Sequence, residues 1–345
     1  MTTIASLGEF GLIRHLTENI QLKNASTRKG IGDDAAVLEY KDKQILVTTD
    51  LLLEGIHFDL TYVPFKHLGY KAAVVNFSDI YAMNGQPKQL TVSLGISNRF
   101  SVEDLEDFYS GLKLACSIYG VDLIGGDTSA SLTGLCISIT CIGEADNDRI
   151  VYRNGAKIKD LIYVSGDLGA AYMGLQLLER EKSVFAGEKD FVPDFAGKEY
   201  LLERQLKPEA RKDIIQILND NRILPTSMID VSDGLSSDLL HICKQSNVGC
   251  IVYEERLPVD YQTAMMAERF NLNVTTVALN GGEDYELLFT VPLRFHEKME
   301  QLTGVKPVGY ICDVSSGTNL VTRDGTQIPL VAQGWNPLTV TKSSD

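Results

Sequence analysis

Acidic residues recur in this sequence directly after short apolar runs, next to glycine or hydroxyl side chains. Any one of these positions is an ordinary turn, because aspartate and glycine favour turns for backbone reasons. Together they supply many hard oxygen ligands, which can hold divalent cations and, through them, phosphates. The positions are Asp33 and Asp34 in GIGDDAAVL, Asp50 in ILVTTDLLLEG, Asp79 in VVNFSDIYAM, Asp127 in LIGGDTS, Asp230 and Asp233 in MIDVSDGLSSDL, and Glu283 and Asp284 in LNGGEDYELLF.

Asp79 can be placed by helical periodicity. The segment 66–84 predicts a helix, on which Ala72, Val75 and Ala82 share a face with Asp79. Its carboxylate is therefore expected to point toward the core, where it needs a cation or strong donors. A bound metal ion and a structural salt bridge both meet that need.

Hydroxyl side chains accompany two of the other acidic positions. Thr48 and Thr49 directly precede Asp50, and Ser232 separates the two acids of IDVSDG. Mg²⁺ takes six hard oxygen ligands and accepts some of them from substrate phosphates. The chain contains only five histidines and no HExxH motif, so zinc is disfavoured and magnesium is favoured.

The common phosphate-binding and catalytic motifs are absent from the sequence. It contains no P-loop, no GxSxG elbow, no HRD and DFG pair and no GxGxxG. VSGDLGAAYMG, which starts at Val164, is a glycine turn whose amides could bind an anion, although ordinary helix entry is the favoured interpretation. A nucleotide would therefore be bound through metals rather than through a standard loop.

Composition and charge limit the class of protein. The 345 residues, 44% hydrophobic and 23% charged, indicate a folded protein with two domains. A net charge of -14 argues against nucleic acid and anionic membranes as partners. No signal-peptide or bilayer-spanning pattern occurs, and six scattered cysteines without CxxC fit a reducing compartment. We expect a cytoplasmic protein.

Apolar periodicity indicates strands and helices without regular βαβ alternation. The polar passage 144–160 carries turn signals and predicts a boundary near residue 147, which gives domains 1–147 and 148–340. We expect strands at 35–40, 45–49, 89–96, 121–124, 135–142, 161–165, 228–231, 250–254, 285–291 and 307–311, a turn after 124, helices at 66–84, 101–120, 165–179, 209–218 and 236–244, and a polar surface excursion at 181–200.

Taken together and in this order, these motifs resemble those of the thiamine-monophosphate kinases. That family belongs to a superfamily with aminoimidazole ribonucleotide synthetase and selenophosphate synthetase. The resemblance covers nearly the whole chain, and the ordered set is far more specific than any single motif. It is carried by GEFGLI, GIGDDAAVL, TTDLLLEGIHF, YKAAVVNFSDIYAMNGQP, LIGGDTS, YRNGAK, IDVSDGLSSDL and GGEDYELLFTV.

The resemblance implies ATP-dependent phosphorylation of thiamine monophosphate to thiamine diphosphate. Several Mg²⁺ ions would bridge ATP and substrate, and the catalytic residues would be Asp50, Asp127 and Asp233. The implied metal ligands are Asp34, Thr48, Thr49, Asp50, Asp79, Asp127, Asp230 and Asp233. The implied contacts are Gly126, Asp127, Arg153, Ser232 and Tyr109 to ATP, and His57, Glu283 and Trp335 to the thiamine phosphate.

Three of these residues also have a purely structural explanation. His57 could lie on the surface at a strand end, Arg153 could form a salt bridge between the domains, and Trp335 could pack on the core. The chain also departs from the family near its end, where GWNPL places Pro337 at a position that often holds histidine.

The resemblance further implies a fold and an assembly. An α+β N-terminal domain would pair its sheet with that of a second subunit to form a barrel in a homodimer. A C-terminal α/β domain would complete the active site.

The acceptor would be a phosphate monoester, whose second pKa is about 6, so it is mostly deprotonated at neutral pH. No general base is required, and we expect direct in-line transfer without a phosphoenzyme. The alternatives are another ATP-dependent enzyme of the superfamily, such as aminoimidazole ribonucleotide synthetase, and a non-catalytic protein that binds metal or phosphate.

Overall fold

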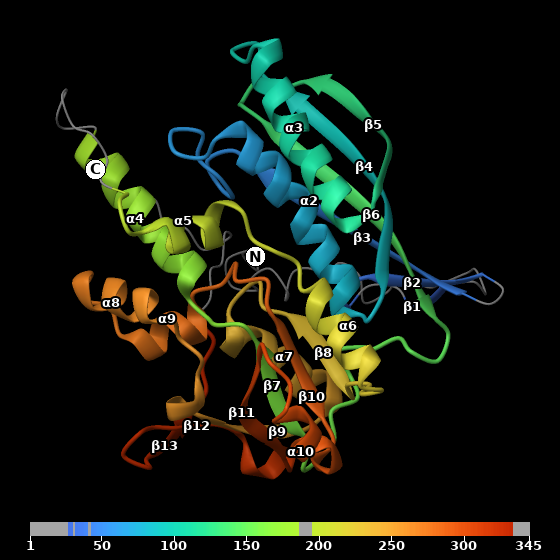
Figure 1. Cartoon of the computed structure of the whole chain (residues 1–345), viewed down its shortest axis with the longest axis vertical. Coiled ribbons are helices and arrows are strands. Elements are labelled where there is room, and N and C mark those ends of the chain that lie inside the picture. Colours follow the sequence, from blue (N-terminus) through green and yellow to red (C-terminus); the bar gives the residue numbers. More distant parts are fainter. Residues whose placement is uncertain (1–26, 30–31, 41–42, 186–194, 334–345) are drawn as a thin grey trace, which may run out of the picture.

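The computed structural model describes residues 27–29, 32–40, 43–185 and 195–333. Trp335 and Pro337 therefore lie outside the described residues. The chain forms a mixed α/β fold with two sheets, one from each half of the sequence, and Figure 1 shows the first sheet above the second. The expected mixture of strands and helices is confirmed.

The first sheet has the strand order β1-β2-β3-β6-β4-β5. Its neighbouring strands pair antiparallel, except that β4 and β5 run parallel. The strands expected at 35–40 and 45–49 are present as β2 and β3, which pair with each other. The strands are β1 (Thr27–Lys29), β2 (Ala36–Tyr40), β3 (Lys43–Leu53), β4 (Gln86–Ile96), β5 (Asp122–Ala130) and β6 (Cys136–Asp146).

Helices α2 (Phe65–Ala82) and α3 (Val102–Tyr119) pack together over the first sheet (Figure 1). Two glycines allow the close helix crossing, because a Cβ on Gly69 would lie 1.9 Å from the Phe108 carbonyl oxygen and Gly111 is similarly crowded. The start of α3 is as predicted, with Ser101 in a capping box. On β3, Leu46 and Leu52 are buried, whereas Leu51 faces solvent.

Strand β5 differs from the sequence prediction. The turn expected after residue 124 is absent, and the chain continues as a strand through Gly125, Gly126 and Asp127 at the edge of the sheet. A Cβ on Gly126 would lie 1.8 Å from the Val92 carbonyl oxygen of β4, while a Cβ on Gly125 would meet nothing within 4 Å. Gly126 is therefore required for strand packing, which explains why two glycines occur inside a strand.

The second sheet has the strand order β13-β12-β9-β11-β7-β10-β8. It is antiparallel apart from the β9 and β12 pair. The strands are β7 (Leu161–Ser165), β8 (Ser227–Asp230), β9 (Gly249–Tyr253), β10 (Leu287–Val291), β11 (Val305–Cys312), β12 (Thr318–Val321) and β13 (Gln327–Pro329).

The helices of the second half lie around this sheet (Figure 1). Part of the expected polar excursion at 181–200 is instead helical, and α8 and α9 were not predicted. The helices are α4 (Ala170–Phe185), α5 (Glu199–Leu206), α6 (Lys212–Asp220), α7 (Leu235–Ser246), α8 (Tyr261–Arg269), α9 (Val274–Asn280) and α10 (His296–Met299), with 3-10 turns η1 (Glu254–Arg256), η2 (Leu293–Phe295) and η3 (Val314–Ser316).

The two halves share buried contacts. One hydrophobic core combines residues of α2 and α3 with Ile214, Met228 and Phe289 of the second half. The hydroxyls of Tyr70 and Tyr119 both donate to Glu209, at 2.8 and 2.6 Å. The two sheets lie on either side of residue 147, and the domain division at that residue stays a prediction.

None of the helices in the described part of the chain is both long and apolar enough to cross a membrane.

Candidate active site

Three of the predicted acids meet where the two halves join. One carboxylate oxygen each from Asp34, Asp79 and Asp230 lies within 4.8 Å of the others. Asp34 precedes β2, Asp79 lies in the last quarter of α2, and Asp230 ends β8. We call these three residues the acid cluster. Its members come from distant parts of the sequence, so the cluster exists only in the folded chain.

Hydroxyl groups orient two carboxylates of the acid cluster. Thr48 Oγ1 donates to Asp79 Oδ2 at 2.5 Å, and Ser78 Oγ donates to Asp230 Oδ2 at 2.7 Å. The predicted position of Asp79 on a buried helix is thus observed, and its surroundings are other acids rather than a basic partner. Ser78 was not singled out from the sequence.

Burial and mutual repulsion disfavour the charged forms of these acids. Burial raises the pKa of Asp50 to about 6, and burial together with Asp34 raises the pKa of Asp230 to about 8. Burial and three neighbouring carboxylates, Asp50 first, raise the pKa of Asp79 well above its ordinary value. A divalent cation relieves such repulsion, and the donors are all oxygen, so the acid cluster can hold a metal ion.

Arg153 is paired with the acid cluster. Its Nε and a terminal nitrogen donate to the two oxygens of Asp34 at 2.8 and 2.9 Å. This is the salt bridge between the two halves that the sequence left open as the alternative to an ATP contact. The ATP contact of Arg153 stays a prediction.

Glu283 and His57 lie at a second polar group, about two helical turns nearer the N-terminus of α2 than Asp79. Lys71 Nζ lies 2.9 Å from Glu283 Oε1, and Gln205 Nε2 donates to Glu283 Oε2 at 3.0 Å. Burial opposes ionisation, but Lys71 first, then Gln205 and the His57 imidazole, hold the pKa of Glu283 below its usual range. His57 lies in the turn after β3, where its Nδ1 accepts from the Leu53 amide at 3.0 Å. The two predicted substrate residues are therefore neighbours.

Asp127 does not join the acid cluster of the same chain. The register pairs β3 with β6, β6 with β4, and β4 with β5, so Asp127 is three strand spacings, about 14 Å, from β3. Asp127 instead lines an open cavity of about 560 Å³ together with Gly125, Gly126 and Tyr109. The predicted ATP residues of the first half are thus gathered at the sheet edge.

The remaining predicted residues surround these groups. Thr49 points away from Thr48, because side chains alternate along a strand, and its hydroxyl donates to the Ile139 carbonyl at 2.9 Å. Asp233 follows β8, and its amide donates to the buried Asp238 carboxylate at 3.3 Å. The Ser232 carbonyl accepts from the Glu283 amide at 2.7 Å, which joins the two segments.

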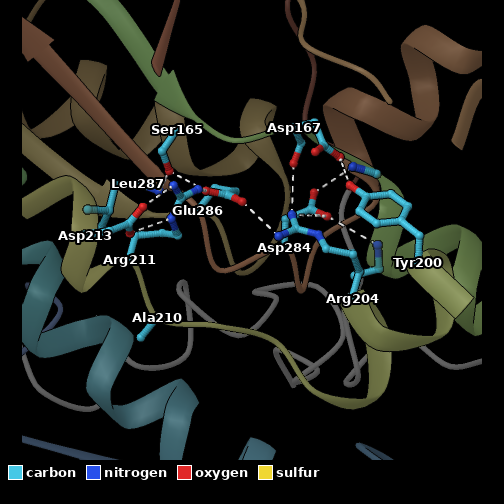
Figure 2. A network of polar contacts seen from close by, with 12 residues as sticks. Ser165, Asp167, Tyr200, Arg204, Ala210, Arg211, Asp213, Asp284, Glu286 and Leu287 are labelled. Atoms are coloured by element: carbon cyan, nitrogen blue, oxygen red, sulfur yellow. Dashed lines mark hydrogen bonds and ion pairs between the residues drawn. The ribbon is translucent and has the colours of Figure 1, made fainter. Parts of the chain in front are cut away.

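The glycine turn before α4 binds an anion that belongs to the protein itself. Asp284 Oδ2 accepts from the Gly169 amide at 2.7 Å, and Asp284 Oδ1 accepts from the Ala171 amide at 3.4 Å. Arg204 lies beside Asp284 and also donates to Glu286 at 2.8 Å, within the polar network of Figure 2. The favoured interpretation, ordinary helix entry, is consistent with this geometry, and Asp284 is an anchor of the fold.

Comparisons with known proteins identify the family of this chain. A family described as AIR synthase related protein, N-terminal domain, matches residues 32–145. A curated thiamine-monophosphate kinase of Aquifex aeolicus strain VF5 is 38% identical over 84% of this chain and 87% of its own length. That of Bacillus subtilis strain 168 is 32% identical over 96% of this chain and 99% of its own. The chain belongs to the thiamine-monophosphate kinase family. The resemblance inferred from the ordered motifs is confirmed.

A solved structure supports the same assignment. AaThiL complexed with AMPPCP and TMP has a TM-score of 0.80 and 34% sequence identity, covering 97% of this chain and 99% of that chain. Membership of the thiamine-monophosphate kinases, which are phosphotransferases, excludes the alternatives within the superfamily as the family of this chain.

Two residues that contact Glu283, Lys71 and Gln205, were not predicted from the sequence. Lys71 precedes Ser78 by seven residues, so both lie on one face of α2, and that spacing was a usable signal. Gln205 gave no signal, because its contact with Glu283 depends on how α5 packs against α2.

Proposed function

We propose that this protein transfers the γ-phosphate of ATP to thiamine monophosphate and so forms thiamine diphosphate. The observation that carries the proposal is the acid cluster at the junction of the two halves, in a chain 34% identical to AaThiL, whose solved structure contains AMPPCP and TMP. The substrate class follows from the family, and the oxygen-only donor set agrees with phosphate chemistry.

We assign several Mg²⁺ ions to this site, and when bound they would neutralise and align the phosphate oxygens. The acid cluster and Asp50 would hold them, with Thr48 orienting Asp79. The other ligands in the proposal are Thr48, Thr49, Asp127 and Asp233.

The side chains contribute positioning and charge rather than acid-base chemistry. The acceptor phosphate is mostly deprotonated at neutral pH, so no side chain needs to remove a proton. Transfer would be direct and in line, with Asp50, Asp127 and Asp233 as the catalytic residues. Gly126, Arg153, Ser232 and Tyr109 would contact ATP, and His57, Glu283 and Trp335 would contact the thiamine phosphate.

We further propose a cytoplasmic homodimer, in which the first sheet pairs with its copy to form a barrel. Its support is the sheet face opposite α2 and α3, where Leu51 is 52% exposed, and the edge strand β5, where Ile124 is 57% exposed. Exposed apolar side chains on a sheet face and edge favour association.

A homodimer would also account for the position of Asp127. Because Asp127 is about 14 Å from β3 in its own chain, it would reach an acid cluster only across the dimer interface. Each active site would then combine the acid cluster of one subunit with Asp127 and Tyr109 of the other.

The test is to incubate the purified protein with ATP, Mg²⁺ and thiamine monophosphate and to measure thiamine diphosphate. Asp50→Asn and Asp127→Asn are the controls, and both should lower the rate by more than about 100-fold. Binding of ATP and Mg²⁺ without turnover would favour a non-catalytic protein. A phosphoprotein detected during turnover would exclude direct transfer.

A further inference from the structure

Glu283 is held by two donors that come from different helices. Lys71 of α2 contacts one carboxylate oxygen and Gln205 of α5 donates to the other, at 2.9 and 3.0 Å. Lys71 Nζ also donates to the Gln205 backbone carbonyl at 3.1 Å. Each oxygen of Glu283 therefore has its own donor, and the plane of the carboxylate is fixed.

The two donors are buried, whereas the glutamate side chain that they hold is partly exposed. The side chain of Lys71 is 8% exposed and that of Glu283 is 34% exposed. Gln205 is buried, and its Oε1 has no hydrogen-bond partner among the described residues. Burying an ammonium and an amide costs desolvation free energy unless hydrogen bonds or ion pairs with their partners offset it. A partly exposed glutamate contributes little to the stability of the fold. Its fixed orientation therefore indicates that it binds a ligand.

The backbone of Glu283 is also constrained. Its φ is +56°, in the left-handed region that non-glycine residues rarely adopt, and the preceding Gly282 has φ +71°. Strain of this kind persists where the surrounding structure determines it, and it is common at ligand sites. On the C-terminal side, Asp284 and Glu286 are anchored by Arg204 (Figure 2).

Helix α2 sets the distance between Glu283 and the acid cluster. Lys71 and Asp79 are eight residues apart on α2, which is about 12 Å along the helix axis. An extended molecule with a phosphate at one end and a cationic or N–H donating group at the other would span that distance.

We propose that Lys71 and Gln205 are positioning residues that present the Glu283 carboxylate, in one orientation, to the organic end of thiamine monophosphate. This inference rests on the proposed function. The organic end carries a positively charged thiazolium ring and an amino group, and both are complementary to a fixed carboxylate. The acceptor phosphate would lie at the acid cluster, so α2 connects recognition of one end with chemistry at the other.

The test compares Gln205→Met and Lys71→Met with a matched control, Lys207→Met. Lys207 also pairs with a glutamate at the junction, Glu209, at 2.9 Å, but it does not contact Glu283. Gln205→Met keeps the side-chain volume and removes an unpartnered oxygen, so this variant should fold even if Lys71→Met does not.

The first readout is the Kd of thiamine monophosphate, measured by titration calorimetry with Mg²⁺. It should rise about 10-fold in Gln205→Met and about 10- to 100-fold in Lys71→Met. The Kd of ATP should stay within about 2-fold in both, and Lys207→Met should change neither value beyond about 2-fold. In turnover, KM for thiamine monophosphate should rise while KM for ATP does not.

A double-mutant cycle separates positioning from a structural role. If Gln205 acts through Glu283, then Gln205→Met should add less than about 2-fold to the loss caused by Glu283→Gln. Additive losses, or an unchanged Kd of thiamine monophosphate in a folded Gln205→Met protein, would overturn the inference. Absence of any thiamine diphosphate from the wild type would instead overturn the proposed function.

Discussion

At the scale of single residues, the acid cluster exchanges stability for the capacity to bind metal. Asp79 lies among like charges, and its nearest donor is the Thr48 hydroxyl. Asp79→Asn keeps an oxygen for Thr48 and removes the group that would have to ionise among other acids. We expect the metal-free variant to be more stable than the wild type by about 1 kcal/mol, from relief of repulsion and desolvation. Urea unfolding in EDTA measures this difference.

The same variant should lose the stabilisation that Mg²⁺ gives to the wild type, because binding to the folded state alone raises its stability. Asp146→Asn, which removes an exposed carboxylate paired with Lys43, is the matched control and should respond to Mg²⁺ like the wild type. A metal-free Asp79→Asn protein that is less stable than the wild type would show that the carboxylate has a structural partner.

The pH dependence of stability should have a definite sign. The pKa values of Asp50 and Asp230 rise from 3.8 to about 6 and about 8, so the folded protein binds protons that the unfolded chain has released. Their contribution to stability is therefore lost as pH rises through these values. The Tm in EDTA should fall as the pH rises from about 4 to about 8. Mg²⁺ should reduce that fall, and a Tm that rises with pH in EDTA would contradict the assignment.

The position of a site residue could be predicted only where the neighbouring sequence determines it. Asp79 was predictable, because helical spacing fixes the face on which it lies. A salt bridge of Arg153 was only one of two possibilities, and its partner Asp34 was not predicted. The two residues are 119 positions apart, and local patterns do not encode such contacts. The contact of Gln205 with Glu283 depends entirely on tertiary packing.

At the scale of elements, the two glycines of β5 have different roles. Gly126→Ala would force a Cβ against the β4 backbone, so we expect a loss of about 3 kcal/mol in the free energy of unfolding. Gly125→Ala meets open space and should stay within about 1 kcal/mol of the wild type. Urea unfolding of both variants tests this, and equal losses would contradict the strand packing described above.

The glycine turn that opens α4 is held by Asp284. Asp284→Ala removes the acceptor of the Gly169 amide, and it also removes one of the buried carboxylates that pair with Arg204. Breaking a buried pair in this way should cost about 3 kcal/mol. Hydrogen exchange should show the loss of protection first at the start of α4, and a variant as stable as the wild type would exclude the anchoring role.

Elements were predictable where their pattern is periodic, as in α3 and β4. The strand character of 125–130 was not predictable, because two glycines followed by aspartate are typical of a turn and only the neighbouring β4 makes them a strand. Helices α8 and α9 were missed because they are short, at nine and seven residues, and short helices carry weak amphipathic signals.

At the scale of the whole molecule, the position of Asp127 decides between two arrangements of the active site. The site lies within one subunit, or it is shared between two subunits. The acid cluster joins both halves of one chain, whereas Asp127 lies on the exposed edge strand, about 14 Å from β3. If a homodimer brings the two together, Asp50→Asn and Asp127→Asn homodimers are each inactive for different reasons. A heterodimer of the two variants then contains one site with both defects and one site with neither.

Refolding the two inactive variants together should therefore restore activity to about a quarter of the wild-type value, since half of the dimers are mixed and each has one intact site. Refolding each variant alone gives the baseline, and sedimentation confirms the dimer. Ile124→Glu in both chains should abolish the recovery, because it places a charge on the edge strand that the proposed interface covers. If the mixture stays at the baseline while dimers form, both aspartates act within one subunit, and the edge strand would have to move toward the acid cluster for catalysis.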